Sequence, residues 1–324
     1  MEYARLGRTA LRVSRICLGT MNFGREASEA EGHAVLDAAL EAGVNFVDTA
    51  NTYGGRRGEG VTEQIVGRWL AGGGGRREKT VLCTKVYGRM SDWPNFNGLS
   101  ALTIVRECEN SLRRLGTDRI DLYQMHHVDR DAPWEEIWQA METLVAQGKV
   151  LYVGSSNFAG WHIAQASEAA RARHVLGLVS EQSLYNLAQR SVELEVLPAC
   201  RAYGLGLIAW SPLFGGVLGG MVRKQAVSGR RTSELARGRL APIYERVQEF
   251  EDFCAERGLE PAEVALAWLL HRDGVTAPIV GPRSVEQLGG ALRAVELKLD
   301  DDTLGRLEEI FPGPGGPAPE AYAW

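Results

Sequence analysis

The feature that most constrains this chain is a regular alternation of strand-like apolar runs with amphipathic helical patterns. Strands are predicted over residues 12–18, 44–47, 80–84, 119–124, 150–153, 178–181, 207–210 and 276–280. The intervening and following helices are predicted over 28–41, 62–70, 100–115, 133–147, 159–172, 192–203, 243–257, 261–271 and 284–293. Eight such units predict an α/β fold, a (β/α)8 TIM barrel with additional helices and long mouth loops. We expect residues 1–324 to form a single domain that ends in a Pro/Gly-rich tail over 312–324.

A doubly wound dinucleotide-binding fold is the main competitor. It would need a Gly-x-Gly-x-x-Gly run directly after an early strand. Gly204 and Gly206 precede a predicted strand, and the glycines of 72–75 follow a helix. The barrel is therefore the better interpretation.

Composition and cysteine use narrow the class of protein. The net charge of -5 argues against a nucleic-acid partner, which would require a basic face. The five cysteines are widely spaced and form no Cys-x-x-Cys pair, as in proteins of a reducing cytosol. The sequence shows neither a signal peptide nor an apolar run of membrane-spanning length. We expect a cytoplasmic protein without a membrane partner.

Polar residues stand at three consecutive strand ends, where barrels carry their chemistry. Asp48, Lys85 and His126 occupy these ends, and Tyr53 lies in the loop after Asp48. A lysine about 4 Å from a phenolate contributes roughly 4 kcal/mol at an effective dielectric near 20. That would lower a phenol pKa by about two to three units. These four residues are candidate catalytic groups, with Asp48 holding Lys85, Tyr53 donating a proton and a neutral His126 orienting a substrate oxygen.

His127 follows His126 directly, so the two side chains should point to opposite faces of the strand. That geometry argues against chelation by the pair, and no carboxylate cluster accompanies them. No metal is expected.

These residues fall in motifs that resemble the aldo-keto reductases over essentially the whole chain. The motifs are Asp-Thr-Ala-Asn-Thr-Tyr-Gly (48–54), Thr-Lys-Val (84–86), Asp-Leu-Tyr-Gln-Met-His (121–126), Gly-Ser-Ser-Asn-Phe (154–158), Glu-Gln-Ser-Leu-Tyr-Asn (181–186), Trp-Ser-Pro-Leu (210–213) and Gly-Pro-Arg-Ser-Val-Glu-Gln-Leu (281–288). The resemblance implies that Tyr53 is the general acid and that an NADPH cofactor lies across the mouth. The cofactor residues that it implies are Gly19, Thr20, Met21, Asp48, Ser156, Asn157, Gln182, Trp210, Ser211, Pro212, Leu213, Gly215, Gly281, Arg283 and Gln287.

Three details refine the resemblance. Arg283 would pair with the 2′-phosphate of the cofactor, a role suited to a guanidinium. Ala291 stands where the family often has an asparagine that contacts adenine. The opening residues resemble the bacterial branch that is itself similar to potassium-channel β subunits, and residues 87–93 resemble reductases of nucleotide-linked deoxysugars.

Three functions follow, in order of preference. The first is an NADPH-dependent reductase of a small-molecule carbonyl, in which Tyr53, Trp93 and His126 contact the substrate. The second is a slow-turnover, NADPH-binding redox-sensing subunit, and the third is a Schiff-base lyase that uses Lys85. A bulky polar ketone, such as a nucleotide-linked keto-sugar, suits the polar and aromatic loop 87–99 and the basic residues Arg223, Lys224, Arg230 and Arg231. The sequence leaves the substrate and the choice between monomer and homo-oligomer open.

Overall fold

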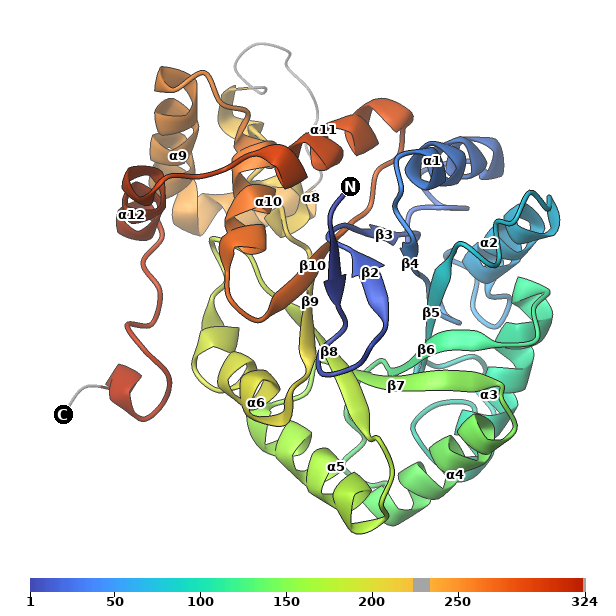
Figure 1. The fold of residues 1–324 in the computed structure, drawn as a ribbon. Coiled ribbons are helices and arrows are strands. Elements are labelled where there is room, and N and C mark those ends of the chain that lie inside the picture. Colours follow the sequence, from blue (N-terminus) through green and yellow to red (C-terminus); the bar gives the residue numbers. More distant parts are fainter. Residues whose placement is uncertain (224–233, 323–324) are drawn as a thin grey trace.

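The computed structural model describes residues 1–223 and 234–322, and at its centre is a ring of parallel strands (Figure 1). In chain order these strands are β3 (Cys17–Gly19), β4 (Phe46–Asp48), β5 (Val81–Val86), β6 (Ile120–Met125), β7 (Val150–Ser156), β8 (Leu178–Leu184), β9 (Gly206–Trp210) and β10 (Val275–Val280). Hydrogen bonding in the order β10-β3-β4-β5-β6-β7-β8-β9 closes the ring. The predicted (β/α)8 barrel is thereby confirmed.

Helices surround the ring on its outer side (Figure 1). They are α1 (Glu29–Glu41), α2 (Val61–Ala71), α3 (Ala101–Leu115), α4 (Trp134–Ala146), α5 (Gly160–Ala172), α6 (Val196–Tyr203), α8 (Glu234–Leu240), α9 (Tyr244–Glu256), α10 (Pro261–His271), α11 (Val285–Glu296) and α12 (Asp301–Ile310). Short 3-10 turns add η1 (Ser191–Glu193), η2 (Phe214–Gly216), η3 (Ala241–Ile243) and η4 (Glu320–Tyr322). Among the described residues, no helix combines the length and apolar character needed to cross a membrane.

The interior of the barrel changes from apolar to polar along the strands. One buried cluster includes apolar side chains from most strands of the ring: Cys17, Phe46, Cys83, Leu122, Val179, Ile208 and Ala277. Side chains alternate between the two faces of a strand, so the residue two positions later points into the same interior. Asp48 therefore lies above Phe46, and Lys85 lies above Cys83, toward the carboxyl ends of the strands. The fold itself delivers these two charges to the mouth.

The predicted strand over 12–18 is wrong in one respect, because the structure divides it in two. β2 (Arg12–Ser14) pairs in antiparallel fashion with β1 (Tyr3–Arg5), and only β3 belongs to the ring. The chain turns between them, where the Ser14 hydroxyl donates to the main-chain oxygen of Ile16. The Arg15 guanidinium donates to the main-chain oxygens of Leu270, Val275 and Thr276. A hydrophobic run alone does not reveal such a corner, since its residues are buried on both sides of it.

The other differences concern the second half of the chain. The predicted helix over 192–203 begins as the turn η1, and its regular part is α6. The helices α8 and α12 have no counterpart in the prediction. In the Pro/Gly-rich tail, Ala318 donates its main-chain N–H to Leu194, so the tail packs against the segment that follows η1.

Close packing of α2 on α3 gives a first testable prediction. A Cβ atom at Gly67 would lie 2.4 Å from the main-chain oxygen of Arg114, whereas at the exposed Gly305 of α12 nothing lies within 4 Å. We expect Gly67→Ala to lower the free energy of unfolding by about 1–3 kcal/mol, because the main chain cannot yield without parting the helices. Gly305→Ala should raise it by roughly 0.5–1 kcal/mol through helix propensity. Urea denaturation of both variants checks this, and equal effects would contradict the packing argument.

Candidate active site

Lys85 is the centre of the polar layer at the barrel mouth. Its side chain has no solvent exposure, and its Nζ donates to Asp48 Oδ2 at 2.5 Å, to the main-chain oxygen of Thr49 at 2.9 Å and to the Tyr53 hydroxyl at 3.1 Å. All three ammonium protons thus have an acceptor. Burial by itself lowers the pKa of Lys85, because it disfavours the charged form. The carboxylate of Asp48 and the phenol of Tyr53 have the larger, opposite effect, so the pKa of Lys85 is raised above its ordinary value. The lysine is held as a cation.

Tyr53 lies in the loop after β4, partly exposed as a residue but with its hydroxyl beside the buried ammonium. Burial raises the pKa of this phenol above its ordinary value, although Lys85 acts in the opposite direction. The lowered pKa that the sequence predicts for Tyr53 has the wrong sign in this structure. A single lysine does not offset the loss of water around the hydroxyl together with the charge of Asp48. The resting phenol therefore keeps its proton at neutral pH.

His126 follows the end of β6 and meets Tyr53 edge to face, with ring centres 5.8 Å apart. Burial, reinforced by the charge of Lys85, lowers the pKa of His126 to about 3. Its imidazole is therefore neutral near pH 7 and has one N–H to donate. His127 is exposed and lies instead against the ring of Tyr87, at 5.3 Å between centres. The structure brings one histidine of the pair to Tyr53, as the strand geometry predicted.

Two buried glutamines complete the surroundings of Asp48. Gln124 of β6 and Gln182 of β8 each donate an amide N–H to Asp48 Oδ1, at 3.1 and 3.0 Å. With its nitrogen turned toward the carboxylate, Gln182 has an amide oxygen that can accept a hydrogen bond from a ligand. Gln124 was missed by the sequence analysis. The available signal was its position two residues before His126, which places it on the same face of the strand.

Asn157 links the next strands around the mouth. Its side-chain nitrogen donates to Ser156 Oγ at 2.9 Å and to the main-chain oxygen of His126 at 3.2 Å. Its side-chain oxygen accepts the indole N–H of Trp210 at 3.0 Å. Asn157 has a φ of 59°, a left-handed conformation that asparagine tolerates. Trp210 is thus anchored by one edge of its ring, which fixes the plane of the indole.

The remaining predicted cofactor residues form a rim at the ends of β3, β9 and β10: Gly19, Thr20, Met21, Ser211, Pro212, Leu213, Gly215, Gly281, Arg283 and Gln287. Some have a partner within the protein. The Thr20 hydroxyl donates to the main-chain oxygen of Asp48, and Gln287 accepts the main-chain N–H of Arg283. Ser211 has a φ of 54° and accepts the N–H of Gly215, forming a tight turn directly after Trp210. Met21 is half exposed.

Comparison with known proteins agrees with this geometry. The Aldo/keto reductase family matches residues 15–311 of the chain. The chain belongs to the aldo/keto reductase family. The resemblance predicted from the motifs is confirmed, and membership makes this chain an oxidoreductase of a family that generally uses nicotinamide cofactors.

Several curated members of the family are similar over most of their length. The chain is 54% identical to the uncharacterized oxidoreductase YrpG of Bacillus subtilis, with 100% of both proteins covered. It is 34% identical to the norsolorinic acid reductase stcV of Emericella nidulans, over 93% of this chain and 79% of that protein. It is 33% identical to a probable voltage-gated potassium channel subunit beta of Oryza sativa, over 96% of each.

Not every residue that was predicted for this aldo/keto reductase joins the mouth cluster. Trp93 is 74% exposed, and no ring contact to Tyr53 or His126 accompanies it. Arg223 pairs with Asp252 of α9 at 3.0 Å, so its charge is used on the outer side of the barrel. Lys224, Arg230 and Arg231 lie outside the described residues.

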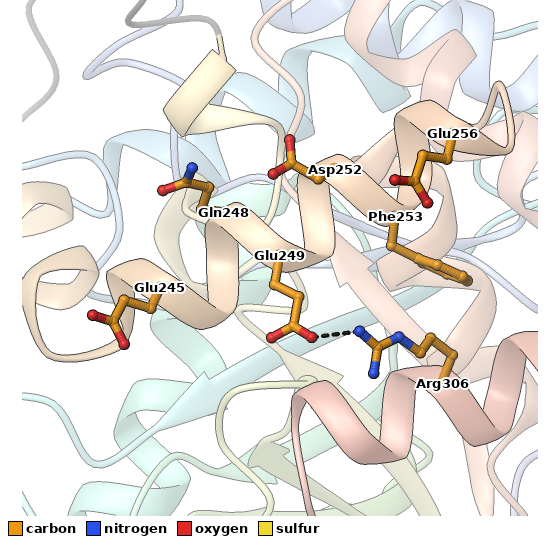
Figure 2. Close-up of a pocket in the computed structure, with 7 residues that line it drawn as sticks. All are labelled: Glu245, Gln248, Glu249, Asp252, Phe253, Glu256 and Arg306. Atoms are coloured by element: carbon orange, nitrogen blue, oxygen red, sulfur yellow. Dashed lines mark hydrogen bonds and ion pairs between the residues drawn. The ribbon is translucent and has the colours of Figure 1, made fainter.

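A hollow of about 380 Å³ lies elsewhere on this reductase, between α9 and α12 (Figure 2). Its lining is mainly acidic: Glu245, Gln248, Glu249, Asp252, Phe253, Glu256 and Arg306. None of the residues at the strand ends contributes to it. The hollow therefore lies apart from the polar residues of the barrel mouth, and we do not place the active site in it.

The low pKa of His126 gives a prediction about acid stability. The unfolded chain takes up a proton near pH 6.5 and the folded chain only near pH 3, so the free energy of unfolding falls as the pH drops through this interval. Between pH 7 and pH 5 this one residue accounts for a loss of about 2 kcal/mol. In urea denaturation, the free energy of unfolding of wild type should therefore fall by about 2 kcal/mol more between pH 7 and pH 5 than that of His126→Asn. His174→Asn, at an exposed position after α5, should behave as wild type. Parallel curves for His126→Asn and wild type would contradict the buried, neutral imidazole.

Proposed function

We propose that this protein is an NADPH-dependent carbonyl reductase in which Tyr53 donates the proton to the substrate oxygen. The observation that carries the proposal is the position of the Lys85 ammonium, which contacts both the Asp48 carboxylate and the Tyr53 hydroxyl. The neutral ring of His126 contacts the ring of Tyr53 edge to face. Reduction of a carbonyl requires a proton donor, a positive charge that stabilises the donor after it has lost its proton, and a hydrogen-bond donor to the carbonyl oxygen. The phenol of Tyr53, the ammonium of Lys85 and the neutral imidazole of His126 supply these three groups.

The residues present fit a nicotinamide cofactor. Gln182 and Ser156 offer polar groups for a carboxamide, and Trp210 offers an indole whose plane is fixed by Asn157. In the turn after Trp210 the Ser211 hydroxyl accepts the main-chain N–H of Gly215, and a Cβ added at Gly216 would meet nothing within 4 Å, so the rim is open beside this turn. When bound, the cofactor would supply the hydride.

The protein's own residues account for the proton. As negative charge develops on the carbonyl oxygen, His126 donates its N–H to that oxygen and Tyr53 transfers its proton. The phenolate left behind is stabilised by Lys85, whose Nζ lies 3.1 Å from the hydroxyl. At an effective dielectric near 20 that attraction is worth roughly 4 kcal/mol or more, and it acts fully only once the phenolate forms. Burial, which raises the pKa of the resting phenol, keeps the proton in place until then.

Arg283 supports NADPH over NADH as the preferred cofactor. It precedes the N-cap Ser284 of α11, so a guanidinium and a helix N-terminus come together at one edge of the rim. Both favour a phosphate group. The five cysteines are free and buried, which is compatible with the cytoplasmic location expected from the sequence.

A slow redox-sensing subunit is the second candidate, and the similarity to probable potassium channel beta subunits favours it. It would use the same residues to hold the cofactor, and turnover would be negligible on any carbonyl. A Schiff-base lyase fits poorly, because a lysine whose pKa is raised by Asp48 is not a free amine.

For the substrate we propose a bulky polar ketone such as a nucleotide-linked keto-sugar. An ion pair joins the loop after β4 to the loop after β5. Asp92 Oδ1 lies 2.5 Å from Nη1 of Arg57 and 3.6 Å from Nη1 of Arg89. One carboxylate between two guanidiniums leaves net positive charge at this junction, and the exposed Trp93 follows Asp92 directly in the chain. A planar aromatic surface and spare guanidinium donors suit a sugar linked to a diphosphate.

Tyr53→Phe tests the catalytic role. We expect kcat to fall about 10²–10⁴-fold, because the proton donor is lost, while NADPH binds with nearly unchanged affinity. Tyr244→Phe removes an exposed phenol at the start of α9 and should match wild type. Stopped-flow turnover and cofactor fluorescence give the two quantities. Wild-type turnover in Tyr53→Phe would refute the assignment, and negligible turnover of the wild-type protein with tightly held cofactor would favour the redox subunit.

Trp93→Ala tests the substrate class. In wild type, kcat/KM should be higher for a nucleoside-diphosphate keto-sugar than for a simple aromatic aldehyde. The substitution should lower kcat/KM for the sugar about two- to tenfold and leave the aldehyde unchanged. Trp161→Ala, which removes an exposed tryptophan from α5, is the control. A preference for the aldehyde, with no effect of Trp93→Ala, would leave only the general carbonyl reductase.

A further inference from the structure

The edge of the rim where β3 and β10 meet carries an acidic residue that the proposed function does not use. Glu26 lies in the loop between β3 and α1, and this loop is tightly held. The main-chain oxygen of Asn22 accepts N–H groups from Arg25, Glu26 and Ala27 at 2.9–3.1 Å. The Asn22 side chain donates to the main-chain oxygen of Gly281 at 2.8 Å, which joins the loop to the end of β10. The main chain at Glu26 is therefore held relative to β10 through Asn22, whose main-chain oxygen binds the loop and whose side chain binds Gly281.

Arg283 lies opposite this loop and forms an ion pair with Glu26, with Nη1 and Oε2 2.9 Å apart. The side chains are 57% and 46% exposed, so both are within reach of a ligand. The main-chain N–H of Arg283 is occupied by Gln287, which leaves the guanidinium as the part of the residue that can respond to a ligand. In this structure Nη1 of that guanidinium is already paired with the carboxylate of Glu26.

We propose that Glu26 is a specificity-determining residue that weakens the preference for NADPH over NADH. This inference rests on the proposed function, in which Arg283 binds the 2′-phosphate. A phosphate can engage the guanidinium only by sharing it with, or displacing, the carboxylate of Glu26, and the two anions repel each other. The 2′-hydroxyl of NADH carries no charge and meets no such repulsion. Glu26 therefore acts against the phosphate alone.

Binding of adenosine fragments to the intact protein tests this without turnover. The probes are adenosine 2′,5′-bisphosphate and adenosine 5′-monophosphate, titrated by calorimetry at low salt. Glu26→Gln should tighten the bisphosphate about two- to fivefold, the range expected for release of an exposed ion pair, and leave the monophosphate unchanged. NADPH and NADH, followed by fluorescence, should show the same contrast.

Glu249→Gln is the matched control. Glu249 of α9 forms an exposed ion pair with Arg306 of α12 (Figure 2), in a hollow that no strand-end residue lines. Glu249→Gln removes one negative charge from an exposed Glu–Arg pair, as Glu26→Gln does. An effect of net charge on anion binding will therefore be equal in the two variants. Equal tightening of the bisphosphate by both variants, or no tightening by Glu26→Gln, would overturn the role of Glu26.

Arg283→Ala separates this inference from the proposed function. It should weaken the bisphosphate about tenfold or more and spare the monophosphate. If it weakens both fragments equally, the assignment of NADPH to this rim is wrong. If it discriminates between them while Glu26→Gln behaves as Glu249→Gln, Arg283 keeps its role and only the inference about Glu26 fails.

Discussion

The buried ion pair between Lys85 and Asp48 is the interaction on which the mouth of this barrel depends. A lysine with no solvent exposure loses the hydration of its charge, and the fold can tolerate this only if acceptors surround it. Parallel pairing of β4 with β5 brings the carboxylate of Asp48 to 2.5 Å from the ammonium, and the loop after β4 adds Thr49 and Tyr53. Removing either member of the pair would leave the other charge buried without its partner.

The same pair organises the uncharged groups around it. Asp48 has a second oxygen, and Gln124 and Gln182 both donate to it. Because the carboxylate fixes which way the amide of Gln182 points, its acceptor oxygen is presented to any ligand in the mouth. Asn157 performs a similar task for Trp210 by accepting its indole N–H. Buried hydrogen bonds thus join side chains from β4, β5, β6 and β8 into the floor of the mouth, and the part-buried pair of Asn157 and Trp210 of β9 lies beside it.

The rim differs from this floor in its exposure to solvent. Glu26 and Arg283 are each about half exposed, and Trp93 is mostly exposed. Charge pairs in such positions are weak and screened by salt, so a ligand of the right charge can replace them. In the proposed reductase the proton is handled by the buried, hydrogen-bonded floor. The choice of cofactor and substrate belongs to a rim whose contacts are easily exchanged.

The sequence alone determined the barrel and much of its floor, because both follow from local periodicity. Alternating patterns define the eight units, and the carboxyl ends of parallel strands meet at one mouth, to which the inward-facing residues Asp48 and Lys85 contribute their side chains. Tertiary structure decided what depends on distant neighbours. Residues 12–18 hold a corner because of the contacts that Ser14 and Arg15 make, and Glu26 meets Arg283 only because the ring closes. The sign of the pKa shift at Tyr53 also needed the structure. Burial and charge act in opposite directions on this phenol, and only the packing around it determines which is larger.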